Sequence, residues 1–131
     1  MGSVLCVTRN GEGGIRAQKE AIRIAKNRGN PLVFLYIADS SFLNKLAAPI
    51  VVDIKDILVS MGRFILLAAN ERASAEGVKA RSIVRYGVWR DELLDLVSEI
   101  DPTTIIIGHL TGGPSCIEKA EREKLLISIR E

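Results

Sequence analysis

The chain of 131 residues contains few aromatic residues, two cysteines, one histidine and almost no net charge. Aromatic residues make up 5% of the sequence, which disfavours a stacking surface for single-stranded nucleic acid. The formal net charge of +2 is too small to indicate an electrostatic surface for nucleic acid or anionic lipid. We therefore expect neither nucleic acid nor a membrane to be a partner.

The sequence also lacks the features of a membrane span, a signal peptide and a metal site. No apolar run reaches the roughly 18 residues that a membrane-spanning helix needs, and Met1 is not followed by a basic flank or cleavage site. Cys6 and Cys116 lie far apart in no metal-type spacing, and His109 has no second histidine to share a metal ion. We expect a reduced cytoplasmic protein without a metal site, with His109 as a loop side chain.

Several enzyme motifs are missing as well. There is no Gly-x4-Gly-Lys-Ser/Thr phosphate loop, and no serine stands in a Gly-x-Ser-x-Gly elbow. Arg9 and Asn10 occupy the place where a phospho-receiver domain would carry acidic residues. Because the sequence shows neither an acid–base pair nor a nucleophile–base pair, we expect no catalytic residue and no enzymatic activity.

Short apolar runs alternate along the chain with segments of helical periodicity. Continuous apolar runs indicate strands that are covered on both faces, and apolar spacings of three and four indicate helices. The expected strands are residues 4–7, 32–38, 79–86, 103–107 and 125–129, and the expected helices begin near residues 15, 54, 89 and 115. This alternation predicts one α/β domain over residues 1–131, with a parallel sheet and helices on both faces. The strand at 79–86 alternates in polarity, which places it at a sheet edge.

The fourth strand ends at Ile107 and runs into a loop with three glycines, Gly108, Gly112 and Gly113. Ligands of open α/β sheets bind at such carboxyl ends of strands. Ser115-x-x-Glu118 has the pattern of a capping box, so we expect a short helix to begin there. Two interpretations stay open: the N–H groups before this helix bind phosphate or sulfate, or the same residues form a tight turn and a helix cap.

A second glycine-rich segment follows the first strand. Gly11-x-Gly13-x-x-Arg16 departs from the dinucleotide-binding fingerprint, because Arg16 replaces the glycine that permits close helix–strand packing. Asp39 ends the next strand, where the ribose-binding acid of that fingerprint would lie. With its third glycine missing, the dinucleotide interpretation is not favoured.

Several segments carry a resemblance to a known family. They are Val4–Thr8, the ladder Ala17/Ala21/Ala25, Leu35–Asp39, Val84–Gly87 and Ile105–Gly108. Together they resemble the universal stress protein family over nearly the whole chain. The resemblance implies a five-stranded parallel sheet in the order 3-2-1-4-5, of the Rossmann-like type also called adenine nucleotide alpha hydrolase-like. It also implies that ATP is a ligand of some members and not of others.

The sequence departs from the pattern of the ATP-binding members. They carry an acidic residue after the first strand, and Gly-x-x-Gly followed nine residues later by Gly and Ser or Thr. Here Arg9, or Asn10 if the register shifts by one residue, stands at the acidic position and Thr111 at the second glycine. The later pair is Glu121 and Arg122, or Arg122 and Glu123 when counted from Gly112. Hydrogen bonds to a charged group contribute about 1.5–3 kcal/mol each, so losing two or three lowers affinity by on the order of 10³-fold.

The resemblance therefore implies a degenerate nucleotide or anion pocket, and no cofactor is expected. Its residues, by resemblance, are Thr8, Arg9, Ile37, Gly108, Thr111, Gly112 and Gly113. We expect a stress-associated regulatory or binding protein that does not bind ATP tightly. One alternative is an ATP or AMP sensor in which Arg9 and the loop Gly108–Gly113 clamp the phosphates. Another is a small-molecule enzyme that uses the same crevice.

The last expected strand, Leu125–Ile129, bears on partners. An apolar edge strand left exposed invites pairing with another chain, and a two-fold axis pairs identical strands antiparallel. The family resemblance points the same way, because many members form dimers through the last strand. We therefore expect a homodimer through Leu125–Ile129, with a further protein partner left open.

Overall fold

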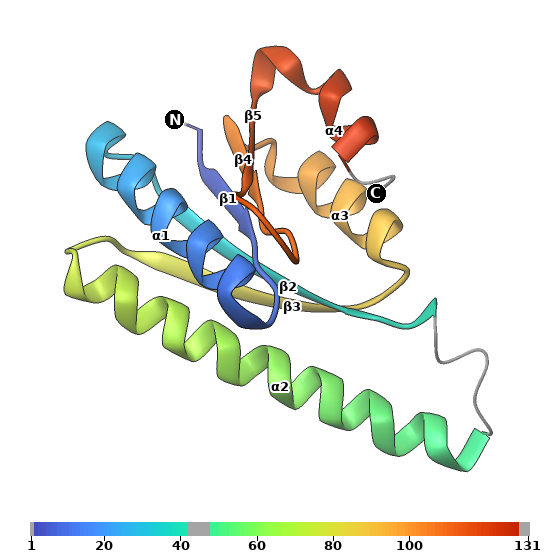
Figure 1. Cartoon of the computed structure of the whole chain (residues 1–131). Helices are drawn as coiled ribbons and strands as arrows, with labels where there is room; N and C mark the ends of the chain where they lie inside the picture. Colours follow the sequence, from blue (N-terminus) through green and yellow to red (C-terminus); the bar gives the residue numbers. More distant parts are fainter. Residues whose placement is uncertain (1, 42–47, 129–131) are drawn as a thin grey trace.

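The computed structural model describes residues 2–41 and 48–128, which fold around one five-stranded sheet (Figure 1). The elements in chain order are β1 (Val4–Val7), α1 (Gly11–Arg28), β2 (Leu32–Asp39), α2 (Ala48–Ala75), β3 (Ala80–Gly87), α3 (Trp89–Ile100), β4 (Thr104–Ile107), β5 (Ser115–Glu118), the 3-10 helix η2 (Lys119–Glu121) and α4 (Glu123–Ser128). The strand order is β3-β2-β1-β4-β5, which confirms the expected order.

Strands β1 to β4 are parallel, with β1 in the centre. Val4 lies opposite Leu32 of β2 on one side and Thr104 of β4 on the other. Every residue of β1 and β4 is buried, as expected for strands that read as unbroken apolar runs. β3 lies at the sheet edge and is less buried, so its predicted edge position is confirmed.

The helices form a layer on each face of the sheet. The face toward α1 and α2 receives Val4 and Cys6 of β1, whereas the face toward α3 receives Leu5 and Val7. This alternation follows from the two-residue period of side chains along a strand. α2 begins at Ala48, earlier than the expected start near residue 54. Pro49 falls in its first turn, where the absence of a backbone N–H costs no helical hydrogen bond.

The prediction for the end of the chain was wrong in two respects. The described part of the expected strand, Leu125–Ser128, belongs to the helix α4, and Ile129 lies outside the described residues. The expected helix start at Ser115 is instead the start of β5, which runs antiparallel to β4. The sheet is therefore mixed, not fully parallel.

The reason for this difference is a hairpin after β4. Gly112 adopts a φ of 78°, and the chain turns back so that Ser115 lies opposite Ile107 and Glu118 opposite Thr104. An antiparallel neighbour of this kind needs no crossover helix. Glu118 accepts hydrogen bonds from Thr104 and Arg28, so it does not act as the capping partner of Ser115.

Candidate functional site

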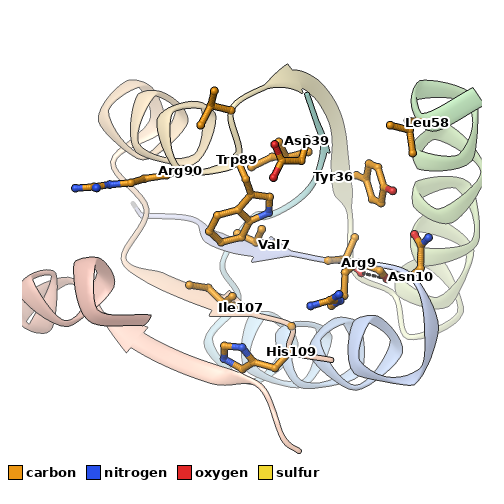
Figure 2. A pocket seen from close by; sticks show the side chains of 14 residues that line it. Val7, Arg9, Asn10, Tyr36, Asp39, Leu58, Trp89, Arg90, Ile107 and His109 are labelled. Atoms are coloured by element: carbon orange, nitrogen blue, oxygen red, sulfur yellow. Dashed lines mark hydrogen bonds between the residues drawn. The ribbon is translucent and has the colours of Figure 1, made fainter. Parts of the chain in front are cut away.

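A pocket of about 590 Å³ opens at the carboxyl ends of β1, β2 and β4, between α2 and the start of α3 (Figure 2). Ligands of open α/β sheets bind at this position. The lining residues come from five parts of the chain: Val7, Thr8, Arg9 and Asn10; Tyr36, Ile37 and Asp39; Leu58; Val88, Trp89 and Arg90; and Ile107, Gly108 and His109.

Four of the seven residues named from the sequence line this pocket. They are Thr8, Arg9, Ile37 and Gly108. The other three, Thr111, Gly112 and Gly113, lie farther along the hairpin loop and do not line it. The carbonyl of Gly112 accepts a hydrogen bond from Arg16 of α1 at 3.2 Å, so this part of the loop is tied to the side of α1.

Thr8 belongs to a chain of hydrogen-bonded polar groups behind the pocket wall. Its side chain is buried, and its hydroxyl accepts a hydrogen bond from Gln18 Nε2 at 2.9 Å. Gln18 Oε1 in turn accepts one from Arg72 of α2 at 2.6 Å. Thr8 Oγ1 also lies 3.3 Å from the carbonyl oxygen of Gly14, to which it donates. The hydroxyl is thus fully engaged, and its role is to hold the loop after β1 against α1 and α2.

The start of α1 packs directly against the loop after β4. A Cβ atom added at Gly13 would lie 1.6 Å from the carbonyl oxygen of His109, and one added at Gly108 would lie 3.0 Å from the carbonyl oxygen of Gly13. The two loops therefore meet backbone to backbone. His109 directs its backbone carbonyl oxygen toward the first turn of α1, and this oxygen cannot donate a hydrogen bond to a phosphate.

His109 is a loop side chain, as expected from the sequence. Its Nε2 atom lies 2.6 Å from Ser115 Oγ, the first residue of β5. The contact joins the two ends of the hairpin loop. Since the ring also borders the pocket (Figure 2), this hydrogen bond fixes the orientation of one pocket wall.

Arg9 supplies positive charge to the pocket. Its side chain points into the pocket in Figure 2, whereas that of Arg90 extends away from it. Arg9 is exposed, and within the described part of the chain it makes no ion pair. Asp39, on another wall, accepts a hydrogen bond from the backbone N–H of Ser41 at 2.9 Å.

Trp89, the first residue of α3, is a pocket residue that the sequence analysis missed. Its ring lies over Val7 and Ile107 in the pocket and packs against the core between the sheet and α3 (Figure 2). The apolar spacing of α3 indicates only that Trp89 is on the buried face. Its position right after β3, beside the carboxyl ends of the strands, was the signal that could have identified it.

Tyr36 is the pocket residue whose pKa is shifted. Burial raises the pKa of the Tyr36 phenol, so this pocket residue stays neutral and hydrogen-bonding at physiological pH. Over residues 2–41 and 48–128, no group of three or more His, Cys, Asp or Glu side chains is placed to hold a metal ion. In the same part of the chain, no helix is both long enough and apolar enough to cross a bilayer.

Comparison with known proteins gives a consistent result. Universal stress protein UspA from Lactobacillus plantarum superposes with a TM-score of 0.72 and 16% identity, over 84% of this chain and 80% of its own. A protein from the universal stress protein family of Burkholderia pseudomallei gives 0.70 and 21%, over 98% and 90%. The universal stress protein of Archaeoglobus fulgidus gives 0.64 and 19%, over 96% and 91%. A search of curated proteins found no significant match.

The structural likeness establishes the fold, because the identities are low. The family model "Universal stress protein family" matches residues 1–115, which includes four strands, three helices and the start of β5. The chain belongs to the universal stress protein family.

Proposed function

We propose that this protein is a cytoplasmic regulatory or binding member of its family, without enzymatic activity, whose pocket does not hold ATP tightly. The observation that carries the proposal is the hairpin after β4. The loop 108–114 leads into a strand, so no helix N-terminus follows Gly112 and Gly113 to bind an anion. The three residues expected to surround a phosphate therefore lie outside the pocket wall.

The electrostatics of the pocket support the same proposal. Arg9 is the cationic side chain that points inward, and one charged hydrogen-bonding partner contributes about 1.5–3 kcal/mol. That contribution alone corresponds to a dissociation constant above roughly 1 mM. The ring of Trp89 occupies space over Val7 and Ile107 that a ligand would otherwise share. Without a helix start after the β4 loop or a phosphate loop, Arg9 has little help in binding a triphosphate.

The test is a titration with Mg-ATP followed by two independent methods. Trp89 is the single tryptophan of the chain and lines the pocket, so its fluorescence reports occupancy. We expect no saturable change in fluorescence up to millimolar ATP, and native mass spectrometry of the freshly purified protein should show no nucleotide mass. A micromolar dissociation constant, or a nucleotide carried through purification, would contradict the proposal.

One observation favours a second candidate, an ATP or AMP sensor that uses Arg9 as its phosphate clamp. Arg9 points into the pocket and makes no ion pair within the described residues, so it is available to an anion. This candidate predicts that Arg9→Ala abolishes nucleotide binding, whereas Arg90→Ala does not, because Arg90 extends away from the pocket. Equal affinities of the two variants would rule out this clamp.

A further inference from the structure

The outer face of α2 carries a stripe of exposed apolar side chains. Ile57, Met61, Phe64 and Leu67 are 59%, 36%, 74% and 59% exposed. They follow one another at spacings of four and three residues, which places them along one side of the helix. The opposite side, with Leu66, Ala69 and Ala73, is buried against the sheet. In Figure 1, no other described element lies on the outer side of α2.

The same outer face carries no charge over this length. The other residues of this face are small and uncharged: Ser60 lies between Ile57 and Leu67, and Ala68 follows Leu67. Arg63 lies at the side of the helix, where it borders a groove together with Asn70 and Ser82 of the edge strand β3. A solvent-facing helix surface is ordinarily charged or polar, and a contiguous exposed apolar patch marks an interaction surface.

The size of the stripe matches half of a symmetric interface. A large side chain offers roughly 200 Å², so the four exposed fractions amount to about 450 Å² per copy. Two stripes facing each other bury about 900 Å² of apolar area, and apolar atoms form about 60–65% of such interfaces. The implied total of about 1,400 Å² falls in the range of stable complexes, about 1,200–2,000 Å².

Neither sheet edge offers a comparable surface. β5 has four residues, its Cys116 is exposed, and its Glu118 is bound to Arg28. β3 carries Arg81 and Arg85. Short strands and charged side chains are devices that keep sheet edges from pairing. The homodimer expected through Leu125–Ile129 loses its basis, since no strand forms at Leu125–Ser128.

A lipid surface also fits the stripe poorly. Helices that lie on membranes carry Lys and Arg along the border of their apolar face. Around this stripe the charges are of both signs, with Lys55, Asp56, Arg63 and Glu71 within one turn of its ends or at its side.

We infer that α2 is the homodimer surface: a second copy packs its stripe on the first, with the two helices antiparallel across a two-fold axis near Phe64. With the axis between Met61 and Phe64, antiparallel packing places Met61 of each copy near Phe64 of the other and Ile57 near Ala68, because the members of each pair are equally far from the axis. This pairing matches apolar groups with apolar groups and makes the contact identical from both sides. The inference does not depend on what the pocket binds.

The experiment compares two residues of equal exposure. Phe64 lies in the stripe and Leu110 in the loop after β4, and each is 74% exposed. By sedimentation velocity we expect the wild type and Leu110→Glu to be dimers at tens of micromolar, and Phe64→Glu to be a monomer. A second stripe variant, Leu67→Glu, should also be monomeric. Circular dichroism and thermal melting are the controls that establish whether each variant is folded. The melting temperature of the wild type should rise with protein concentration, unlike that of the stripe variants.

Three results would overturn the inference. The first is a wild-type protein that is monomeric at 100 µM. The second is a dimer that survives both Phe64→Glu and Leu67→Glu, which would place the interface elsewhere. The third is a monomer that binds phosphatidylcholine/phosphatidylserine vesicles in flotation, with binding lost in Phe64→Glu, which would make lipid the occupant.

Discussion

Gly13 and Gly113 are two glycines in opposite surroundings. A Cβ at Gly13 would lie 1.6 Å from the His109 carbonyl oxygen, whereas a Cβ at Gly113 would meet nothing within 4 Å. Gly113 also has no positive φ. We predict that Gly13→Ala destabilises the protein by more than about 2 kcal/mol, because backbone must move to relieve the overlap. Gly113→Ala should be neutral, or stabilising by up to about 1 kcal/mol, because it restricts the unfolded chain.

Urea unfolding followed by circular dichroism measures both changes under identical conditions. The comparison tests whether the start of α1 and the loop after β4 touch through their backbones. If Gly13→Ala were as stable as the wild type, the two loops would have to be farther apart than the structure places them.

The pocket residues show which parts of a site can be read from sequence. Thr8, Arg9, Ile37 and Gly108 were named by resemblance to the family. They line the pocket because they lie at or next to the carboxyl ends of parallel strands, which come together at one edge of the sheet. Trp89 was missed because its helical periodicity says only that it is buried. Gly112 and Gly113 do not line the pocket, and their glycine pair suits both an anion-binding turn and a hairpin. The choice between them depends on whether the residues after the pair form a helix or return along β4 as a strand.

At the scale of elements, β5 is held in place by Glu118. Its carboxylate accepts hydrogen bonds from Arg28 of α1 at 3.1 Å and from Thr104 of β4 at 2.9 Å. The hydrogen bond from Arg28, followed by that from Thr104, lowers the pKa of Glu118 below its ordinary value of 4.5. A carboxyl group with a lowered pKa in the folded state stabilises it above the unfolded pKa, and the contribution disappears as pH falls through the folded pKa.

We therefore predict a pH-dependent effect of Glu118→Gln. Because the side chain is 39% exposed, the loss at pH 7 should be modest, about 0.2–1 kcal/mol. The difference from wild type should shrink as the pH falls below about 4.5 and through the lowered pKa of the folded state. Urea unfolding at pH 7, 5 and 3 measures it. Glu12→Gln is the matched control, since Glu12 is 86% exposed in its pair with Arg16 and should have little effect at any pH. A difference that stayed constant down to pH 3 would contradict the role assigned to the carboxylate.

The elements also divide into those that sequence patterns determine and those that they do not. β1, β2 and β4 are apolar runs that only a doubly covered strand accommodates, so their prediction is confirmed. Ser115–Glu118 is only four residues long and does not alternate in polarity, and its ends resemble a capping box, so local rules favoured a helix. The strand forms because β4 offers an open edge and Ile117 reaches the core on the α3 side. That information is tertiary and is absent from the local pattern.

At the scale of the whole molecule, the two cysteines differ in burial, so the reactivity of Cys6 reports opening of the core and that of Cys116 does not. Cys6 is fully buried on the central strand, and burial strongly raises the pKa of its thiol. Cys116 is exposed on β5. We predict that one thiol per native chain reacts with Ellman's reagent, and that none reacts on the same timescale in Cys116→Ser. Reaction needs a thiolate in contact with the reagent, so Cys6 becomes available only when the core opens.

The rate at which Cys6 is modified should therefore rise with urea in step with global unfolding. The Cys116→Ser variant isolates this signal, and the complementary Cys6→Ala variant should retain the fast reaction. Fast modification of Cys6 in native buffer would show that the centre of the sheet opens locally.

The pairing of β1 sets the order in which this protein can be completed during synthesis. Val4 is synthesised long before Thr104, yet its neighbours on the two sides are Leu32 and Thr104. During translation, one side of this buried strand therefore has no partner until β4 has emerged from the ribosome. During that interval the nascent chain exposes apolar surface and an unpaired strand edge, both of which are prone to aggregation. β4 and the hairpin that extends it therefore join the sheet last, and a chain whose synthesis stalls before Thr104 leaves one side of β1 unpaired.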